Sequence, residues 1–516
     1  MNSEGMNVER ARALMRGLEK RGVRVWLGNG EAIRYRAPKG TIGVAEMELL
    51  NRHRDAIVGE LRRATHRYNG RMGDSENVAP LTFVQLAHWN TYGLDRRRSA
   101  CIIPLAVRLR GPVCMSALKE GALEVISRHG ALRTKVEIEN EPTQRVVDTG
   151  GANVTVEKVA AGSGSWSAGE LHHLLLDAIP PYIDPVRDPL CGVRIFDLGE
   201  QDFIVLMYME HVISDGFSLA VALRDLLTSY RLEVYGSRRS ARERPFQYLE
   251  YAHAQRAHHE IWLAAHGGYL SNHFAGCGRV RIPRRTPQGS ESRSGWGVAE
   301  FRFDESLVRL VHTASRSLHT TVVMATFISY VAFVMRWCDV SDMVVLFQSD
   351  GRARAGCQES IGYYAFPLYL RIHLDRSDTL ADLSAKIIAE YCAALEHADE
   401  GWMESSVPRP EFTRNTCFNW LPRAALEPRF FAGSHEQLSV TEVAIDTHNL
   451  GRLERDTEPM MGIVGAPDEI AGGVYFPRDR FGDESMERFV TAFLRFSADV
   501  LENPSSNVND VRVQLE

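Results

Sequence analysis

The first part of the chain changes its hydrophobic period twice. Apolar residues recur at helical spacing, then alternate with polar residues on either side of Asn29-Gly30, and then return to helical spacing. Alternation around an Asn-Gly pair predicts a β-hairpin, and a period of about 3.6 predicts helices. The segments, in order, are residues 8–20, 23–27, 33–35 and 44–61. We therefore expect a small α+β domain over residues 1–66, followed by a polar linker over residues 67–77.

Strands and helices alternate through the second part of the chain, which predicts an α/β fold. Residues 203–209 (FIVLMYM) form a continuous apolar run, as in a strand buried on both faces, and residues 217–232 form an amphipathic helix. Residues 277–296 are rich in Arg, Pro and Gly and have no periodic pattern. They are the expected connection between an N-lobe at 78–276 and a C-lobe at 297–516.

Composition narrows the class of protein. The most apolar uncharged stretch, residues 320–335, is shorter than the roughly 20 residues of a membrane-spanning helix, so it predicts a buried core helix. The first residues show no secretory leader, and the eight cysteines are scattered without a Cys-x-x-Cys pair. We expect a cytoplasmic protein with reduced thiols, no metal site and no association with membranes.

Charge is distributed unevenly along the 516 residues. Residues 1–65 carry a net charge of +5, whereas the whole chain carries −6, so the remainder is acidic. An acidic body argues against nucleic-acid binding, and a basic head suits an acidic partner.

The segment that suggests chemistry is residues 209–218, M-E-H-V-I-S-D-G-F-S. The buried strand ends at Glu210 and His211, and a short turn containing Asp215 and Gly216 leads into the next helix. A histidine at such a strand end is placed to contact a substrate, and its ordinary pKa suits a base near neutral pH. The alternative is a structural histidine capped by a carboxylate.

His211, Asp215 and Gly216 form the pattern His-x-x-x-Asp-Gly, which resembles the active-site motif of the chloramphenicol acetyltransferase and condensation-domain superfamily. Condensation domains of nonribosomal peptide synthetases usually have a second histidine where this chain has Glu210. Further matches run through the body in the family order, although Ala87 and His88 depart from the first of them. The matching residues are Thr82, Gln85, Trp89, Arg128–Thr134, Gln247, Tyr248, Tyr251, Ala252, Gly351, Arg352, Glu359–Gly362, His397, Asp399, Arg414 and Asn415.

The resemblance implies a pseudo-dimer of two chloramphenicol acetyltransferase-like lobes with a central tunnel. The substrate is then an acyl chain on the phosphopantetheine arm of a carrier protein, with no cofactor bound by the chain itself. The implied site residues fall into three groups. His211 acts as the base or positions the attacking nucleophile, with the Gly216 N–H as an oxyanion donor. Asp215 and Arg352 form a supporting salt bridge. Glu210 is grouped with this support, with a catalytic role left open, and as a nearby carboxylate it is expected to raise the pKa of His211. Ser218, Phe366 and Trp420 line the tunnel.

The head resembles the small β-hairpin docking domains of assembly-line subunits. Those domains bind a short acidic motif at the C-terminus of a partner carrier protein. The residues implied in docking are Arg24, Trp26, Arg34, Arg36 and Lys39. A solvated hairpin without a partner is the alternative.

Three classes of function remain open from the sequence. We favour a stand-alone condensation enzyme that releases a finished chain from a nonribosomal peptide or polyketide assembly line onto a small-molecule acceptor. The others are an inactive recruitment module and a coenzyme A-dependent acyltransferase. Phe366-Pro367, where the family often has Asn-Thr, and a His211 made more basic by Glu210 slightly favour a hydroxyl acceptor, and thus an ester, over an amine and an amide.

Overall fold

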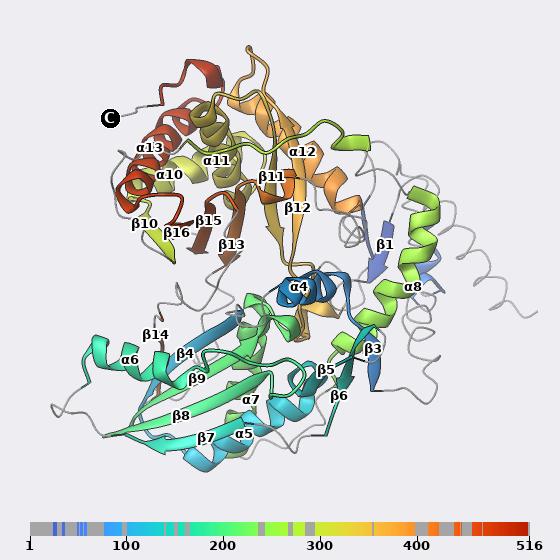
Figure 1. The fold of residues 1–516 in the computed structure, drawn as a ribbon, viewed down its shortest axis with the longest axis vertical. Helices are drawn as coiled ribbons and strands as arrows, with labels where there is room; N and C mark the ends of the chain where they lie inside the picture. Colours follow the sequence, from blue (N-terminus) through green and yellow to red (C-terminus); the bar gives the residue numbers. More distant parts are fainter. Residues whose placement is uncertain are drawn as a thin grey trace, which may run out of the picture.

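The computed structural model shows two α/β lobes and a separate N-terminal hairpin (Figure 1). Lys39 and the helix expected at 8–20 lie outside the residues that it describes. The described residues are 24–27, 33–36, 49–50, 52–54, 56–58, 77–94, 101–138, 141–148, 153–159, 166–235, 243–266, 272–283, 295–352, 356–397, 411–422, 438–443, 445, 457–466 and 468–513.

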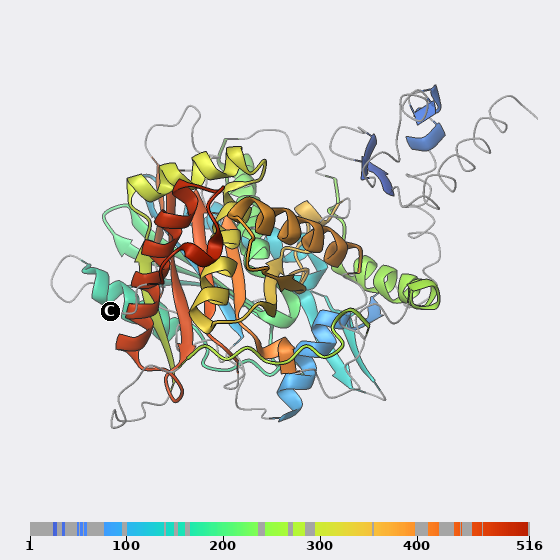
Figure 2. The same ribbon diagram turned by 90° about the horizontal axis from the view of Figure 1, so that it is seen from above.

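The hairpin has the pairing that the sequence predicts. Strands β1 (Arg24–Leu27) and β2 (Ile33–Arg36) are antiparallel, with Arg24 opposite Arg36 and Trp26 opposite Arg34. Figure 2 shows this hairpin set apart from the two lobes.

The N-lobe is built on a five-stranded sheet in the order β14-β4-β9-β8-β7 and a three-stranded sheet in the order β3-β6-β5. All strand pairs in these sheets are antiparallel except β7 with β8. The strands are β3 (Val78–Pro80), β4 (Ile102–Arg110), β5 (Thr134–Ile138), β6 (Pro142–Val146), β7 (Asn153–Lys158), β8 (Cys191–Gly199), β9 (Asp202–Glu210) and β14 (Ser439–Val443). The helices are α4 (Phe83–Leu94), α5 (Met115–Arg128), α6 (Ala168–Ala178), α7 (Gly216–Tyr235) and α8 (Tyr248–His266).

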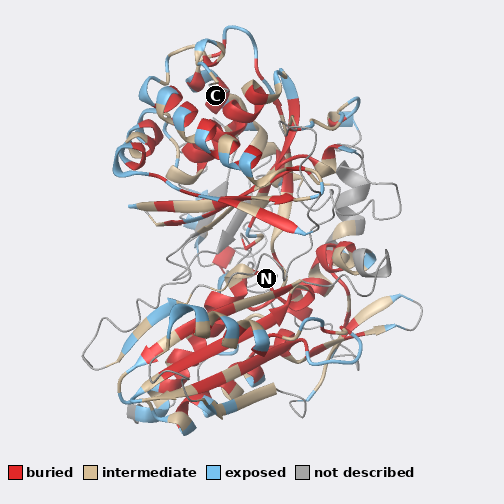
Figure 3. Ribbon diagram, turned by 60° about the vertical axis from the view of Figure 1, so that its left-hand side comes forward, coloured by how far each residue is buried: buried red, intermediate tan, exposed pale blue. Residues whose placement is uncertain are grey.

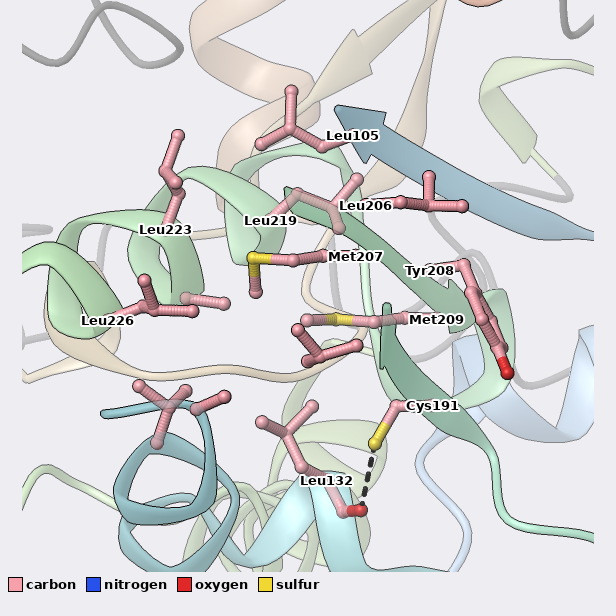
Figure 4. Close-up of a cluster of buried hydrophobic side chains, with 14 of the residues drawn as sticks. Leu105, Leu132, Cys191, Leu206, Met207, Tyr208, Met209, Leu219, Leu223 and Leu226 are labelled. Carbon is pink, nitrogen blue, oxygen red and sulfur yellow. Dashed lines mark hydrogen bonds between the residues drawn. The ribbon is translucent and has the colours of Figure 1, made fainter. Parts of the chain in front are cut away.

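The core of the N-lobe forms where α7 and α5 pack beneath the central strand β9. Figure 4 shows Met207 and Met209 of β9 facing Leu223 and Leu226 of α7. The two helices approach closely at Gly121, where a Cβ atom would lie 3.2 Å from a backbone oxygen of α7. Strand β9 is thus buried between packed layers, as its unbroken apolar run predicts.

The C-lobe has a six-stranded sheet in the order β10-β16-β15-β13-β11-β12, in which β13 runs parallel to β11 and β15. The strands are β10 (Trp296–Arg302), β11 (Asp342–Ser349), β12 (Phe366–His373), β13 (Cys417–Pro422), β15 (Met460–Ala466) and β16 (Glu469–Pro477). The helices are α10 (Glu305–Ser317), α11 (Val322–Cys338), α12 (Leu380–Glu396) and α13 (Asp483–Glu502). Helix α11 is apolar and almost wholly buried, as expected of a core helix, and Figure 3 shows the buried residues gathered along both sheets.

Each lobe contains a segment that the sequence order would assign to the other lobe. Strand β14 follows C-lobe strands in sequence, yet it pairs with the edge of β4 in the N-lobe sheet. In the other direction, the chain reaches the C-lobe earlier than predicted. Phe274 packs against Phe412, and the Ile282 N–H donates to the buried Glu458 of the C-lobe, so the first residues of the expected connection, 277–296, already belong to that lobe.

No single helix among the described residues meets the length and hydropathy of a membrane span. Helices α10 and α11 do so only when taken together, across a bend of 100°.

Candidate active site

His211 lies where strand β9 ends and the chain turns toward helix α7. One 3-10 turn, His211–Ile213, makes this change of direction. The His211 N–H donates to the Cys101 carbonyl (2.7 Å), and the Val212 carbonyl accepts a hydrogen bond from the Gln85 side chain (2.8 Å). The backbone is therefore fixed from both β4 and α4. The imidazole is half-buried, and its Nδ1 has no hydrogen-bond partner among the described residues.

Asp215 is the centre of a buried hydrogen-bond network that joins the two lobes. Its carboxylate forms the expected ion pair with Arg352, with 2.8 Å between Oδ1 and Nη2, and both side chains are at most 3% exposed. Further donors surround it: the Ser218 N–H (2.8 Å) and hydroxyl (2.8 Å), and the Tyr364 (3.0 Å) and Ala365 (3.2 Å) N–H groups. We call Asp215, Ser218, Arg352 and residues 362–365 the latch.

The sequence suggested that Ser218 lines a tunnel, but the structure places it in the latch. Its hydroxyl accepts hydrogen bonds from Arg352 Nη2 (2.9 Å) and from the Gly362 N–H (3.1 Å), and the residue has no exposed surface. It is therefore out of reach of a substrate.

Two glycines allow the latch to close. Gly351 has a φ of +65°, and a Cβ there would lie 1.9 Å from the Tyr364 carbonyl oxygen. A Cβ on Gly362 would lie 2.0 Å from the Tyr248 ring. The Tyr248 hydroxyl donates to the Tyr363 carbonyl (2.6 Å), which fixes the same loop from the N-lobe.

Glu210 interacts with a histidine that the sequence analysis did not assign to the site. Its carboxylate accepts the Val212 N–H and lies 3.3 Å from Nε2 of His88 on helix α4, and only 1% of its side chain is exposed. Burial opposes charge on the His88 imidazole, but the attraction of Glu210 outweighs burial, with help from a hydrogen bond to the Cys101 side chain. Together they raise the pKa of His88 to about 10. His88 is therefore an imidazolium near neutral pH.

Glu210 acts on His211 in the expected direction, because its charge raises the pKa of the imidazole, but the net pKa of His211 is lowered. Burial lowers the pKa of His211 and the positive charge of His88 lowers it further, while Glu210 and Asp215 oppose these effects only in part. The main physical reason is burial of the imidazole, and the second is that His211 faces the His88 cation as well as the Glu210 anion. His211 is consequently neutral near pH 7 and able to accept a proton.

Three rings meet at this point of the structure. Tyr363, from the latch loop of the C-lobe, lies with its ring centroid 4.4 Å from that of His211 and 5.8 Å from that of His88. The two histidine rings are 5.9 Å apart. His211 is thus in contact with both lobes.

The remaining predicted residues lie around this centre. Gly216 begins α7, and a Cβ there would make an ordinary contact of 3.5 Å with Leu421 of the C-lobe. Phe366 and Trp420 are partly buried and pack against the C-lobe core, with the Trp420 ring over Gly465. The lining of a tunnel by these two residues stays a prediction. The described part of the chain contains no group of three or more His, Cys, Asp or Glu side chains placed to hold a metal ion.

Sequence reasoning missed His88 and Tyr363. The signal for His88 was present, because His88 and Glu210 are both departures from the family pattern, and the structure brings these two departures together. Tyr363 occupies a variable position of its motif and gave no signal.

Comparison with known families and proteins gives a consistent result. The family model described as Condensation domain matches residues 75–515. A probable non-canonical nonribosomal peptide synthetase, CymA of Salinispora arenicola, is 26% identical over 84% of this chain and 6% of its own length. Enniatin synthetase of Fusarium oxysporum is 25% identical over 84% of this chain and 14% of its own length. The chain thus spans only a small part of these relatives.

Solved structures share the fold at lower identity. The X-domain from teicoplanin biosynthesis has a TM-score of 0.70 and 18% identity, covering 86% of this chain and 99% of that one. SgcC5 from Streptomyces globisporus has a TM-score of 0.66 and 20% identity, covering 83% and 100% of the two chains. Both match almost end to end, with both lobes included.

Proposed function

This chain belongs to the condensation-domain family, and from that premise we propose that it transfers an acyl chain from a carrier protein to an amine or hydroxyl acceptor. The family acts in nonribosomal peptide synthesis on substrates held as phosphopantetheine thioesters. The donor proposed for this chain is such a thioester, and the acceptor is a small molecule. No cofactor of its own takes part.

The observation that carries the proposal is the environment of His211. The residue is half-buried at the junction of the lobes, is held neutral, and has an unpartnered Nδ1. In the proposed reaction, the acceptor O–H or N–H gives its proton to His211 while the acceptor atom attacks the thioester carbonyl. The C–S bond then breaks, and His211 returns the proton to the leaving thiolate.

Three effects supply the rate. A positioned base of this kind contributes about 10²–10⁴-fold. Holding donor and acceptor in one tunnel, with Phe366 and Trp420 among its proposed lining residues, removes the entropic cost of their encounter. The Gly216 N–H at the start of α7 is the proposed donor to the oxyanion. Asp215 and Arg352 take no direct part, because they are buried in the latch and act by holding the turn that carries His211.

The choice between ester and amide does not follow from Glu210. A more basic His211 would have favoured an alcohol, which is the weaker nucleophile, but the pKa of His211 is lowered. Phe366-Pro367 remains as the departure that supports an unusual acceptor. We therefore extend the proposal to both nucleophiles, as a chain-releasing transfer, and competition between them in one assay will distinguish the products.

The N-terminal hairpin is the proposed docking site for the donor carrier protein. Three arginines occupy paired or adjoining positions of β1 and β2, within a head of net charge +5. An acidic segment at the C-terminus of a carrier subunit is a complementary partner, and it can bind by adding a strand to the hairpin.

The decisive experiment is transfer from an acyl-loaded carrier protein to a panel of matched amines and alcohols, followed by mass spectrometry. His211→Ala should lower the rate by about 10²–10⁴-fold. Its thermal unfolding should be unchanged, because a half-buried imidazole with a free Nδ1 contributes little to stability. A wild-type protein that forms no product with any acceptor, or a His211→Ala variant at full rate, would refute the proposal.

A further inference from the structure

His88 and Glu210 form an ion pair next to His211. The two side chains come from different elements, α4 and β9, and their facing atoms are 3.3 Å apart. Glu210 is 1% exposed and His88 is 10% exposed, so neither charge is solvated as it would be on the surface. A buried carboxylate of this kind needs partners, and among the described residues His88 is a charged partner of Glu210.

We propose that His88 is a positioning residue for acyl transfer: its ion pair with Glu210 offsets the charge of the carboxylate beside His211 and holds the His211 ring against Tyr363. The inference rests on the proposed function and extends it to a residue outside the His-x-x-x-Asp-Gly motif. It also explains why the chain keeps a carboxylate beside its catalytic histidine. The pair has no net charge, so Glu210 can sit next to His211 without making it a permanent cation.

Geometry supports this role independently of charge. The His88 and His211 ring centroids are 5.9 Å apart, and Tyr363 contacts both rings from the C-lobe. Glu210 also accepts the Val212 N–H, so the pair is tied to the turn that carries His211. Movement of His88 would therefore disturb both the turn and the ring contact.

The charged and titratable groups around His211 come from several elements. Among the described residues, His88 is the cation whose charge lowers the pKa of His211, and on the other side Asp215 forms an ion pair with Arg352. The titratable groups near His211 among the described residues are His88 from α4, Glu210 from β9, Asp215 before α7 and Tyr363 from the latch loop, while the carbonyl of Cys101, just before β4, accepts the His211 N–H. His88 is thus the cation whose removal changes the balance most.

The test is a charge series at the pair. His88→Gln keeps a donor to Glu210 but removes the positive charge. Glu210→Gln removes the anion, and with it the reason for His88 to be charged. The double variant has two neutral side chains and, like the wild type, no net charge at the pair. His273→Gln is the matched control, because His273 forms another His–Glu pair, with Glu390 at 2.6 Å in the C-lobe.

Two readouts are measured from pH 5 to 9. One is kcat/KM with a small acyl thioester, and the other is the rate at which diethyl pyrocarbonate modifies the peptide containing His211, which requires a neutral imidazole. Each readout gives a pH profile whose midpoint reports the titration of His211. For unit charges about 6 Å apart, at an effective dielectric constant of about 20–40, loss of the His88 charge should raise the midpoints of both profiles by about one to two pH units. Glu210→Gln should not raise them, and the double variant should return close to the wild-type midpoint. His273→Gln should leave them unchanged.

The outcomes separate this inference from the proposed function. Unchanged midpoints in His88→Gln, or equal shifts in His88→Gln and Glu210→Gln, would overturn the role of His88 even if transfer is normal. The protein could also transfer no acyl group while the pH midpoint of His211 modification shifts as expected. That result would support the role of His88 and refute the proposed function. If His88→Gln does not fold, the Glu210→Gln and double variants still decide the question, because a midpoint raised in either by a full pH unit contradicts the inference.

Discussion

Replacing Asp215 with alanine removes the acceptor that closes the latch between the lobes. The change leaves Arg352 as an unpaired charge that is 2% exposed, which costs about 3–5 kcal/mol. It also leaves the Tyr364 and Ala365 N–H groups without their acceptor, at about 1–3 kcal/mol each if no water replaces it. These penalties are not additive, because water can enter the space of the deleted carboxylate. We expect a loss of about 3–5 kcal/mol, a large share of a typical stability of about 5–15 kcal/mol.

Chemical denaturation and amide hydrogen exchange together measure this loss. The denaturation midpoint should fall, and exchange should quicken first at the amides of Tyr364 and Ala365. Asp342→Ala is the matched control, because Asp342 also pairs with an arginine, Arg371, at 2.8 Å, but both side chains are about one-third exposed. That surface pair should be worth about 0–1 kcal/mol.

Two results would refute the reasoning. Equal losses in Asp215→Ala and Asp342→Ala would show that burial of the latch pair does not matter. A fully stable but inactive Asp215→Ala would place this carboxylate in contact with substrate. Adding Arg352→Met to Asp215→Ala should recover part of the lost stability, because the unpaired charge is then gone.

Three further predictions follow from the same site. Because burial and His88 lower the pKa of His211, the midpoint of the decline in transfer rate on acidification should lie below about 6.5, the ordinary value for histidine; a midpoint above 6.5 would contradict this. Gly362→Ala should cost about 1–3 kcal/mol in a denaturant titration, because its Cβ would lie 2.0 Å from the Tyr248 ring, whereas Gly169→Ala, with nothing within 4 Å, should cost nothing. Deleting residues 1–66 should weaken transfer from the natural carrier protein in a salt-dependent way and spare small thioester surrogates; equal loss with both donors would show that the head has a structural role.

The elements with a strong period were predictable from sequence, and the contacts between lobes were not. The apolar runs at residues 203–209 and 320–335 predicted a buried strand and a core helix. The structure has strand β9 and helix α11 at these positions. Strand β14 gave no such signal, since most of its residues are partly or fully exposed and its partner is far away in sequence. The early passage into the C-lobe was missed for a similar reason, because Phe274 packs on a distant segment.

The site shows the same division. The motif located His211, Asp215 and Gly216, and the resemblance paired Asp215 with Arg352 correctly. The net pKa of His211 was predicted in the wrong direction, because the prediction used only Glu210, its neighbour in sequence, and the sequence showed neither the burial of the imidazole nor the position of His88. Electrostatics depends on every charge within a few ångströms, and most of these charges come from other elements.

The pairing of β14 with β4 has a consequence for the newly made chain. The edge of β4 from Ala106 to Arg110 obtains its partner about 330 residues later, which at 5–20 residues per second means about 15–65 seconds of ribosomal synthesis. During that time, the edge of the N-lobe sheet can pair with a second nascent chain. Arg108 and Arg110 on this stretch, and Pro104 on the part of β4 that β14 does not cover, discourage such pairing. A fragment that ends before residue 439 would keep this edge open permanently, so we expect the isolated N-lobe to aggregate where the two-lobed chain does not.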